Sequence, residues 1–254
     1  MTNEPAPYDS HLAPCTLHFK PAAYRPMRTW TALESAITTC RRCPRLVAWR
    51  EEVARVKRRA YQDEAYWGKP VPGFGDSGAR VLIVGLAPGA HGANRTGRMF
   101  TGDSSGDFLY AALHRAGFAS QPTSRSREDR LTLTGAYISA ACRCAPPDNK
   151  PTTGELAACQ PFLAEEIALL KTVSVIVTLG RIAFDAVLRV YADLQPASSR
   201  RERPEFAHNV AASLGPGLPK LIASYHPSRQ NTQTGRLTVE MFDEVWLRAK
   251  NLTD

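Results

Sequence analysis

The sequence predicts an α/β fold in which a parallel sheet is layered by helices. Two observations support this class. Four short apolar runs occur along the chain and each ends in a Gly-, Pro- or polar-rich loop, while amphipathic helix patterns lie between the runs. Strands that alternate with helices are joined by right-handed crossovers, so the four runs are expected to form parallel strands of one sheet.

The first apolar run covers residues 81–84 and feeds the loop GLAPGAHGANRTGRMFTGD at 85–103. Four consecutive apolar residues suit a parallel strand that is covered on both faces. Ligands of such sheets bind beyond the carboxyl ends of the strands, so this loop is the first place to expect chemistry. A plain connector is the alternative, but loops of this length are usually functional.

The chain before this loop is less regular. Residues 1–28 are rich in Pro, Ala and short polar residues, and we expect an extended or disordered lead before a single domain over 29–254. A short helix is expected over 31–39, and a second one begins at Pro44 and continues through RLVAWREEVARVKRRA. Two prolines and four glycines in the segment 61–79 indicate a shaped loop.

Helices and strands alternate after the Gly-rich loop. The expected elements are a helix over 105–117, a strand over 136–141, a helix over 154–171 capped by Thr153, a strand over 173–180, a helix over 181–192, a strand over 221–225 and a closing helix over 238–250. Residues 193–218 lack a pattern and are expected to be irregular. Neither an internal repeat nor a second domain is evident.

The charge balance indicates an anionic partner. The chain has 32 Lys and Arg against 24 Asp and Glu, for a net charge of +8. Nucleic acid is the usual partner of such a chain, and simple solubility is the alternative. No apolar run approaches the roughly 20 residues of a membrane span, and the N-terminus lacks the order of a signal peptide, so we expect a cytoplasmic protein.

Six cysteines in a reducing compartment are more typical of metal binding or catalysis than of disulfides. A metal or iron–sulfur site would take four thiolates: Cys40, Cys43, Cys159 and either Cys142 or Cys144. Cys15 falls in the N-terminal lead and is a poor ligand candidate. Spacing alone does not separate zinc from a [4Fe–4S] cluster, and buried unligated cysteines are the alternative.

Three polar side chains follow three of the predicted strands at the same edge of the sheet. Asp103 follows the first strand, Asn149 the second and His226 the fourth. Each has a plain structural alternative as a helix N-cap, a turn residue or a buried histidine. Beside Phe100 they suit a pocket for a flat polar heterocycle, because an aromatic ring stacks on its face and an amide binds its edge.

Four longer motifs resemble the family 5 uracil-DNA glycosylases, the B-type enzymes of bacteria and archaea. The motifs are C-x-x-C-P-R-L-V at 40–47, GLAPGAHGANRTGRMFTGD at 85–103, RCAPPDNKPT at 143–152 and YHPSRQNTQTGRLT at 225–238. The resemblance covers residues 34–250 and implies a three-layer α/β/α fold around a central four-stranded parallel sheet. It also implies a monofunctional glycosylase, acting as a monomer, that removes uracil and other deaminated bases from DNA and leaves an abasic site.

The resemblance further implies a [4Fe–4S] cluster and a set of site residues. The cluster ligands fall on Cys40, Cys43, Cys144 and Cys159, which leaves Cys142 surplus. The catalytic residues are expected at Asp103, Asn149 and His226. From their positions in the motifs, we expect base binding at Gly85, Ala87, Phe100 and Asn149 and DNA contacts at Arg95, Arg229, Gln230 and Arg236. A solvated loop is the alternative for the last three.

The chain departs from other branches of the superfamily at two places. Those branches have an acidic residue near the positions of Leu86 or Ala87, which are apolar here, so Asp103 is the nearest carboxylate in this loop. They also have a base-reading Asn where this chain has Ala140, and we expect Asn149 to make that contact instead.

Two other classes of function stay open from the residues alone. A nucleotide or nucleoside hydrolase would use the same Gly-rich strand ends and act on small molecules. A non-catalytic iron–sulfur module would bind nucleic acid without releasing a base. DNA that contains uracil is the expected partner under the family resemblance, with DNA binding placing the protein at the nucleoid.

Overall fold

A computed structural model describes residues 29–194 and 203–253 of the chain. Their strands form one sheet in the order β1-β3-β2-β4-β6-β5. The expected lead over residues 1–28 and the start of the irregular excursion, at 195–202, lie outside the described residues.

Four parallel strands form the centre of the sheet, as the sequence predicts. They are β2 (Val81–Gly85), β3 (Ala136–Ala140), β4 (Val175–Leu179) and β6 (Lys220–Ser224). Their registers are level at the carboxyl ends, because Gly85 is paired with Ala140 and Leu179 with Ser224. The loops that follow these strands therefore begin at one edge of the sheet.

Two edge strands were not predicted from the sequence. Strand β1 (Phe74–Gly75) pairs antiparallel with β3, and β5 (Val210–Ser213) pairs antiparallel with β6. The first is two residues long and lies in the Pro- and Gly-rich loop, so it has no alternation to detect. The residues of the second are exposed or half-buried, as expected for an edge strand, and the prediction of an irregular segment is wrong at 210–213.

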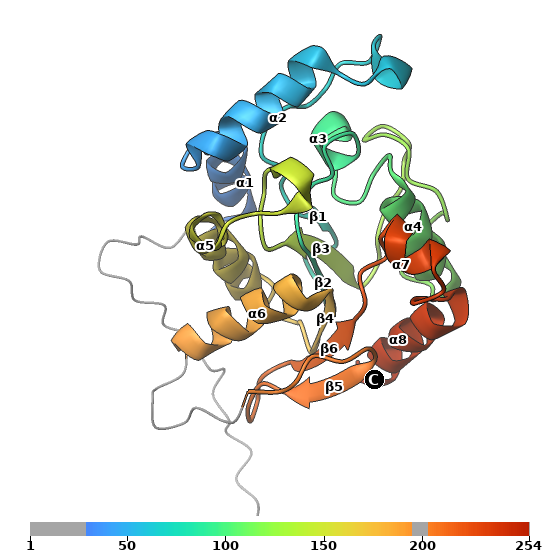
Figure 1. The fold of residues 1–254 in the computed structure, drawn as a ribbon. Coiled ribbons are helices and arrows are strands. Elements are labelled where there is room, and N and C mark those ends of the chain that lie inside the picture. The colour runs from blue at the N-terminus through green and yellow to red at the C-terminus, as the bar shows by residue number, and fades with distance from the viewer. Residues whose placement is uncertain (1–28, 195–202, 254) are drawn as a thin grey trace, which may run out of the picture.

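Helices cover both faces of the sheet (Figure 1). On one face α1 (Trp30–Thr38), α5 (Thr153–Leu169) and α6 (Arg181–Leu194) pack on side chains such as Leu82 and Ile176. On the other face α4 (Ser104–Arg115) and α8 (Val239–Asn251) pack on neighbours in the same strands, such as Ile83 and Val177. Alternate residues of each strand thus enter two separate cores, which explains the uninterrupted apolar runs. The predicted α/β/α layering is confirmed.

The remaining elements lie in the loops around the site. They are α2 (Pro44–Val56), the 3-10 turns η1 (Arg59–Tyr61) and η2 (Pro147–Asn149), and the short helices α3 (Ala93–Thr96) and α7 (Arg229–Gln233). The second helix ends earlier than predicted, because Lys57 has a φ of 59°. A residue in this left-handed conformation cannot continue a right-handed helix. The basic segment after Lys57 is therefore free to turn toward the site.

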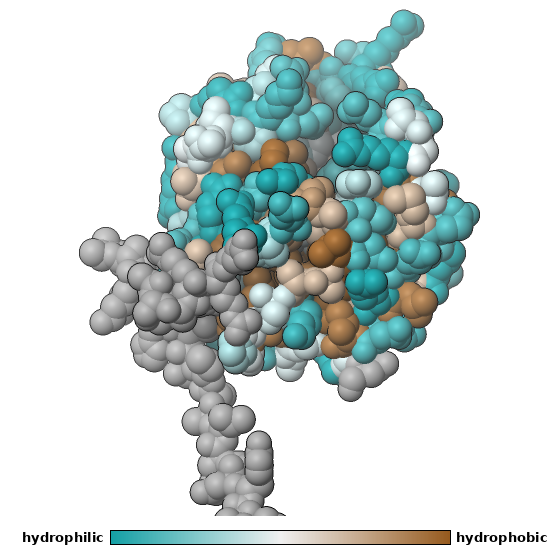
Figure 2. Space-filling model, turned by 60° about the horizontal axis from the view of Figure 1, so that its bottom comes forward, coloured by the Kyte–Doolittle hydropathy of each residue, from teal (hydrophilic) through white to brown (hydrophobic). Residues whose placement is uncertain are grey.

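Hydrophobic side chains on the surface are scattered. The face in Figure 2 is mostly hydrophilic with small separate apolar groups. The exposed large ones are distributed over α2, α6, β5 and α8 with its C-cap: Trp49, Val56, Ile182, Val210, Val239, Leu247 and Leu252. None of the helices over 29–194 and 203–253 combines the length and hydrophobicity that crossing a bilayer requires.

The N-terminus of α5 carries a capping box, one residue before the predicted cap. The Thr152 side chain accepts a hydrogen bond from Glu155 N, and the Glu155 carboxylate accepts one from Thr152 N. We predict that Thr152→Ala lowers the free energy of unfolding by about 1 kcal/mol, because it leaves a helix N–H without its acceptor. Urea unfolding measures this change. Thr153→Ala, at an exposed position inside the helix, is the matched control, and an equal loss in both variants would contradict the assignment.

Candidate active site

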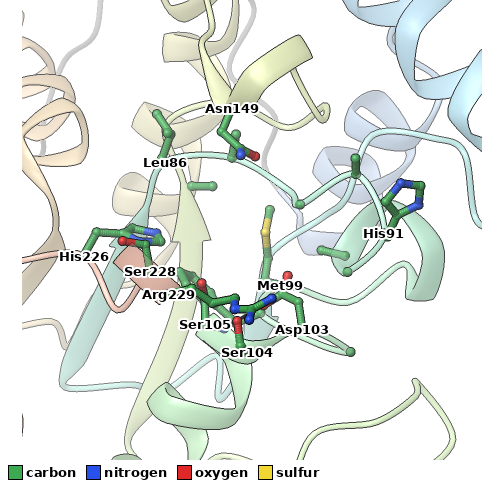
Figure 3. Close-up of a pocket in the computed structure, with 18 of the residues that line it drawn as sticks. Leu86, His91, Met99, Asp103, Ser104, Ser105, Asn149, His226, Ser228 and Arg229 are labelled. Atoms are coloured by element: carbon green, nitrogen blue, oxygen red, sulfur yellow. Dashed lines mark hydrogen bonds between the residues drawn. The ribbon is translucent and has the colours of Figure 1, made fainter. Parts of the chain in front are cut away.

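One pocket of about 790 Å³ opens at the carboxyl edge of the sheet. Its walls come from the loop after β2, from the start of α4, from η2 after β3 and from the segment after β6. Figure 3 shows Asp103, Asn149 and His226 around this pocket. The structure therefore brings together the three side chains that the sequence singled out, each on a different loop.

The two carboxylate oxygens of Asp103 have different roles. It is the N-cap of α4, and Oδ1 accepts hydrogen bonds from the backbone N–H groups of Ser105 and Gly106, at 3.1 and 3.0 Å. The second oxygen, Oδ2, lies against the glycine loop, where a Cβ on Gly92 would come within 1.9 Å of it. Gly92 thus makes room for the carboxylate. Oδ1 is held by the helix, and Oδ2 is left for a ligand.

The environment of Asp103 changes its acidity. Burial raises the pKa of the carboxyl, and the N–H groups of Gly106 and Ser105 oppose that rise. A raised pKa makes the carboxylate a stronger base toward a nearby water molecule.

Phe100 and His226 face each other across the pocket. Their ring centroids are 6.0 Å apart and the rings are tilted by 31°. Phe100 has a φ of 52°, which is uncommon for a bulky residue and marks a locally strained backbone. The ring lies where a Cβ on Gly85 would come within 2.7 Å of it, so Gly85 is needed for the ring to reach this position.

His226 is half-buried in the wall of the pocket. Burial lowers the pKa of its imidazole to about 4, because the protein interior disfavours the charged form. Its backbone carbonyl accepts a hydrogen bond from Asn231 Nδ2 at 2.8 Å. At neutral pH the ring is therefore neutral, and it would act as a hydrogen-bond donor without carrying a charge.

Asn149 lines the pocket from a strained turn. Asp148 and Asn149 have φ values of 53° and 56°, a left-handed pair that asparagine and aspartate tolerate better than most residues. The turn is tied to α2, because Arg45 donates to Lys150 O at 3.0 Å and to both oxygens of Glu155. The loop with Asn149 is thus held by the helix that follows the C-x-x-C segment.

Of the two other predicted base-binding positions, Ala87 lines the pocket and Gly85 does not. Ala87 lines the pocket together with Leu86 and Ala140, so the three apolar positions noted in the sequence form its floor. Gly85 acts through the ring of Phe100 and does not itself line the pocket.

The guanidinium of Arg95 is engaged by other residues of the protein, so its geometry gives no support to the predicted DNA contact. Its guanidinium pairs with Glu64, donates to Gly102 O at 3.0 Å and lies 3.9 Å from the ring centroid of Tyr61. The side chain is buried. Arg95 fastens the segment after α2 to the Gly-rich loop.

The predicted DNA contacts after β6 lie in two places. Arg229 and Gln230 are exposed in α7 and line the pocket mouth. Arg236 is exposed as well, but its guanidinium lies 4.7 Å from the ring centroid of Tyr225 and it does not line the pocket. The first two are available to a ligand at the pocket, whereas Arg236 would reach only DNA that extends beyond it.

The structure adds pocket residues that the sequence analysis did not select. They include Arg58, Tyr61, His91 and Ser228. His91 belongs to the Gly-rich motif at 85–103, so the sequence contained a signal that could have identified it. Arg58 lies in the segment expected to continue the second helix, and the early end of α2 brings it to the pocket.

Four cysteines surround one small cavity beside α2 and α5. They are Cys40, Cys43, Cys144 and Cys159, the set that the resemblance implies. Cys142 does not line this cavity. Its thiol donates to Cys144 O at 3.6 Å and also contacts Cys159. Within the described residues, no three His, Cys, Asp or Glu side chains are placed to hold one metal ion.

Two buried arginines with incompletely satisfied N–H groups lie at the same cavity, which suits an anionic occupant. Arg50 and Arg143 are buried and both line the cavity. Arg50 donates to Cys144 Sγ at 2.9 Å, and Arg143 N donates to Cys159 Sγ at 3.4 Å. Arg143 also pairs with buried Glu166. Arg50 Nε and Arg143 Nε and Nη1 have no hydrogen-bond partner in the described part of the chain, and such groups are costly unless something satisfies them.

Comparisons with known proteins agree on one family. The model of the uracil DNA glycosylase superfamily matches residues 72–250. A type-5 uracil-DNA glycosylase from Thermus thermophilus is 55% identical over 221 residues, covering 87% of this chain and 97% of the relative. One from Mycobacterium leprae is 53% identical, with 87% and 94% covered, and one from Pyrobaculum aerophilum is 45% identical, with 84% and 88% covered.

The low pKa of His226 is measurable by NMR titration of histidine-labelled protein. We predict that the resonances of this ring stay those of a neutral imidazole as the pH falls through the ordinary value of about 6.5, and change only near pH 4. Comparison with His226→Gln assigns the resonances. A midpoint near 6.5 would contradict this effect of burial.

Proposed function

The chain belongs to the uracil DNA glycosylase superfamily and to its type-5 branch, and on that basis we propose how its site removes uracil from DNA. The enzyme is a DNA-repair glycosidase that hydrolyses the N-glycosidic bond of deoxyuridine. One observation carries the mechanism: Asp103, Asn149 and His226 line a single pocket, at the end of different strands.

Cleavage of this bond leaves positive charge on the sugar and negative charge on the departing base. Groups that stabilise these charges accelerate the reaction only to the extent that they act more strongly on the transition state than on the substrate. His226 serves the base end, because a neutral imidazole N–H donates to the pyrimidine oxygen on which charge develops. Its fixed position in the wall of the pocket removes most of the cost of reorganisation.

Asp103 serves the sugar end. Its Oδ1 is held by the start of α4, so Oδ2 is oriented without freedom to turn away. A carboxylate there stabilises the sugar cation and orients the attacking water. Leu86 and Ala87 offer no carboxylate in the loop after β2, so Asp103 takes this part.

Phe100 and Asn149 hold the extruded base. The glycosidic bond is inaccessible in a stacked duplex, so the nucleotide must rotate out of the helix. The ring of Phe100 stacks on the base and the amide of Asn149 bonds to its edge. One amide and one aromatic ring discriminate only weakly between pyrimidines and purines. We therefore propose that the enzyme also removes other deaminated bases.

Surface contacts keep the DNA in place. Arg229 and Gln230 at the pocket mouth contact the DNA strand that carries the flipped nucleotide. The net charge of +8 of the protein adds a non-specific attraction to the DNA phosphates. The enzyme meets this substrate in the cytoplasm, at the nucleoid.

The enzyme is monofunctional and leaves an abasic site. Enzymes that also cut the strand attack the sugar with an amine, which forms a Schiff base. No lysine is among the described residues that line the pocket, which supports water as the nucleophile.

We also propose that Cys40, Cys43, Cys144 and Cys159 hold a [4Fe–4S] cluster. The support is the shared cavity and the buried positive charges of Arg50 and Arg143, each of which has N–H groups without a hydrogen-bond partner in the described residues, since a thiolate-ligated cluster is anionic. When bound, the cluster would link the C-x-x-C segment, the loop after β3 and α5 covalently through its cysteine ligands. The hydrogen bond from Arg45 to Lys150 O then connects this region to the turn that carries Asn149.

A base-release assay tests the function directly. Duplex DNA with one uracil is incubated with the enzyme and then treated with alkali, which cuts abasic sites. We expect cleavage at the uracil position only, with free uracil as the product. Turnover of deoxyuridine or its nucleotide without DNA, or binding of the duplex without base release, would contradict the proposal.

His226→Ala is predicted to slow single-turnover excision by about a hundred- to a thousandfold, which is the usual loss when one preorganised donor is removed. Its affinity for undamaged duplex should change little, because the ring lies inside the pocket. Leu247→Ala, at an exposed position in α8 that does not line the pocket, is the control. Excision by His226→Ala at the parent rate would refute the assignment of the leaving-group donor.

The cluster proposal predicts a brown protein with about four iron atoms per chain. Cys144→Ser should lose the iron and the visible absorption, because it removes a ligand, whereas the neighbouring Cys142→Ser should retain both. Iron analysis and absorption spectroscopy measure this difference. One zinc ion per colourless chain, or equal loss in both variants, would rule out the assignment.

A further inference from the structure

One side of the pocket takes no part in the chemistry above. Figure 3 shows His91 on the opposite side from His226, with Met99 and Asp103 between them. Arg58 and Tyr61 line the same side. This rim, formed by Arg58, Tyr61 and His91, therefore borders the place assigned to the sugar, on the side away from the base.

Tyr66 occupies one of the two ring nitrogens of His91. Tyr66 Oη accepts from the backbone N–H of Arg58 at 3.4 Å, and it lies 3.1 Å from His91 Nδ1. The hydroxyl has one proton and two lone pairs, so beside the bond from the amide it can donate to Nδ1 or accept from it. When Tyr66 donates, Nδ1 is the acceptor and the neutral ring carries its proton on Nε2.

The surroundings keep His91 in this neutral form. Burial lowers the pKa of the imidazole, and the positive charges of Arg58 and Arg95 lower it further. No hydrogen bond from Nε2 is made within residues 29–194 and 203–253. Nε2 is thus open to a ligand, and it is an N–H donor in the tautomer in which Tyr66 donates to Nδ1.

Arg58 offers a charge beside that donor. Its side chain is exposed and lines the pocket, and its guanidinium forms no ion pair with the described residues. The guanidinium of Arg95, in contrast, already has partners in the protein, because it pairs with Glu64 and packs on the ring of Tyr61.

The rim is held in place by the contacts that Arg95 makes. Its Nε donates to His91 O at 2.8 Å, its carbonyl accepts from Trp67 N at 2.8 Å, and its guanidinium covers Tyr61. These bonds join the segment after α2 to the Gly-rich loop on both sides of Tyr66. The backbone of His91 and the ring of Tyr61 are therefore held in place before any ligand arrives, while the exposed Arg58 side chain can turn toward it.

We propose that Arg58 and His91 form a phosphate-binding subsite that holds one DNA phosphate next to the flipped nucleotide. The inference rests on the proposed function, because it places the sugar at Asp103. A phosphate fits better than a base edge, since both groups only donate and one is cationic, whereas a base edge presents donors as well as acceptors. Arg58 supplies charge, and His91 Nε2 supplies a directional hydrogen bond.

Neutral phosphate analogues test the pairing. Duplexes carry one uracil and one methylphosphonate, which removes the charge of a single phosphate, at each position flanking the uracil in turn. In the parent enzyme, one flanking position should slow single-turnover excision by about ten- to a hundredfold, the usual worth of a hydrogen bond to a charged group. In His91→Ala and in Arg58→Ala that penalty should largely disappear, because the partner is already missing.

Other variants separate a phosphate contact from a structural role. His91→Gln retains a side-chain N–H and should recover part of the penalty at the same position. Tyr66→Phe removes the hydroxyl that can donate to His91 Nδ1 and should give an intermediate penalty there. His114→Ala, an exposed histidine near the end of α4, should behave as the parent.

Two results overturn the proposal and are distinguishable. If every methylphosphonate slows His91→Ala and Arg58→Ala by the same factors as the parent, these side chains have no phosphate partner and the subsite is refuted alone. If the parent releases no uracil from the unmodified duplex, the proposed function fails and the subsite fails with it.

Discussion

The level carboxyl ends of four parallel strands are the constraint on which the site depends. Gly85 pairs with Ala140 and Leu179 with Ser224, so the loops after β2, β3 and β6 leave the sheet at one edge. A slip of one residue would turn the side chains of a strand toward the wrong core. Two apolar cores, one on each face, therefore fix the register and so fix the distances among Asp103, Asn149 and His226.

The loops convert this scaffold into a rigid site at some cost in backbone strain. Phe100, Asp148 and Asn149 have left-handed conformations, which persist only where surrounding contacts hold them. The contacts are specific: α4 holds Asp103, glycine at 85 admits the Phe100 ring, and Arg45 ties the turn of Asn149 to α2. A reaction that develops charge at two ends benefits from such fixed groups, because they do not have to reorganise as the bond breaks.

The sequence predicted the sheet centre and its helices well, since both depend on local periodicity. It placed Asp103, Asn149 and His226 at one edge because each follows a strand. It failed where tertiary contacts decide the outcome. The positive φ of Lys57 ends α2 early, the pairing partner alone defines β1 and β5, and the Arg95 guanidinium turns toward Glu64 and Tyr61. No spacing pattern in the sequence predicts the contact between Tyr66 and His91.

The central claim is that the site stabilises a cationic sugar at Asp103 together with an anionic base at His226. Its most direct test is the affinity of the enzyme for duplex DNA in which a pyrrolidine, cationic at neutral pH, replaces the sugar, measured with and without free uracil. Mimics of the transition state bind much more tightly than the substrate when the site is complementary to it. The account predicts tighter binding of the cation than of a neutral tetrahydrofuran analogue, a further gain with uracil, and loss of the cation preference in Asp103→Ala. Equal affinity for the cationic and neutral analogues in the parent enzyme would contradict it.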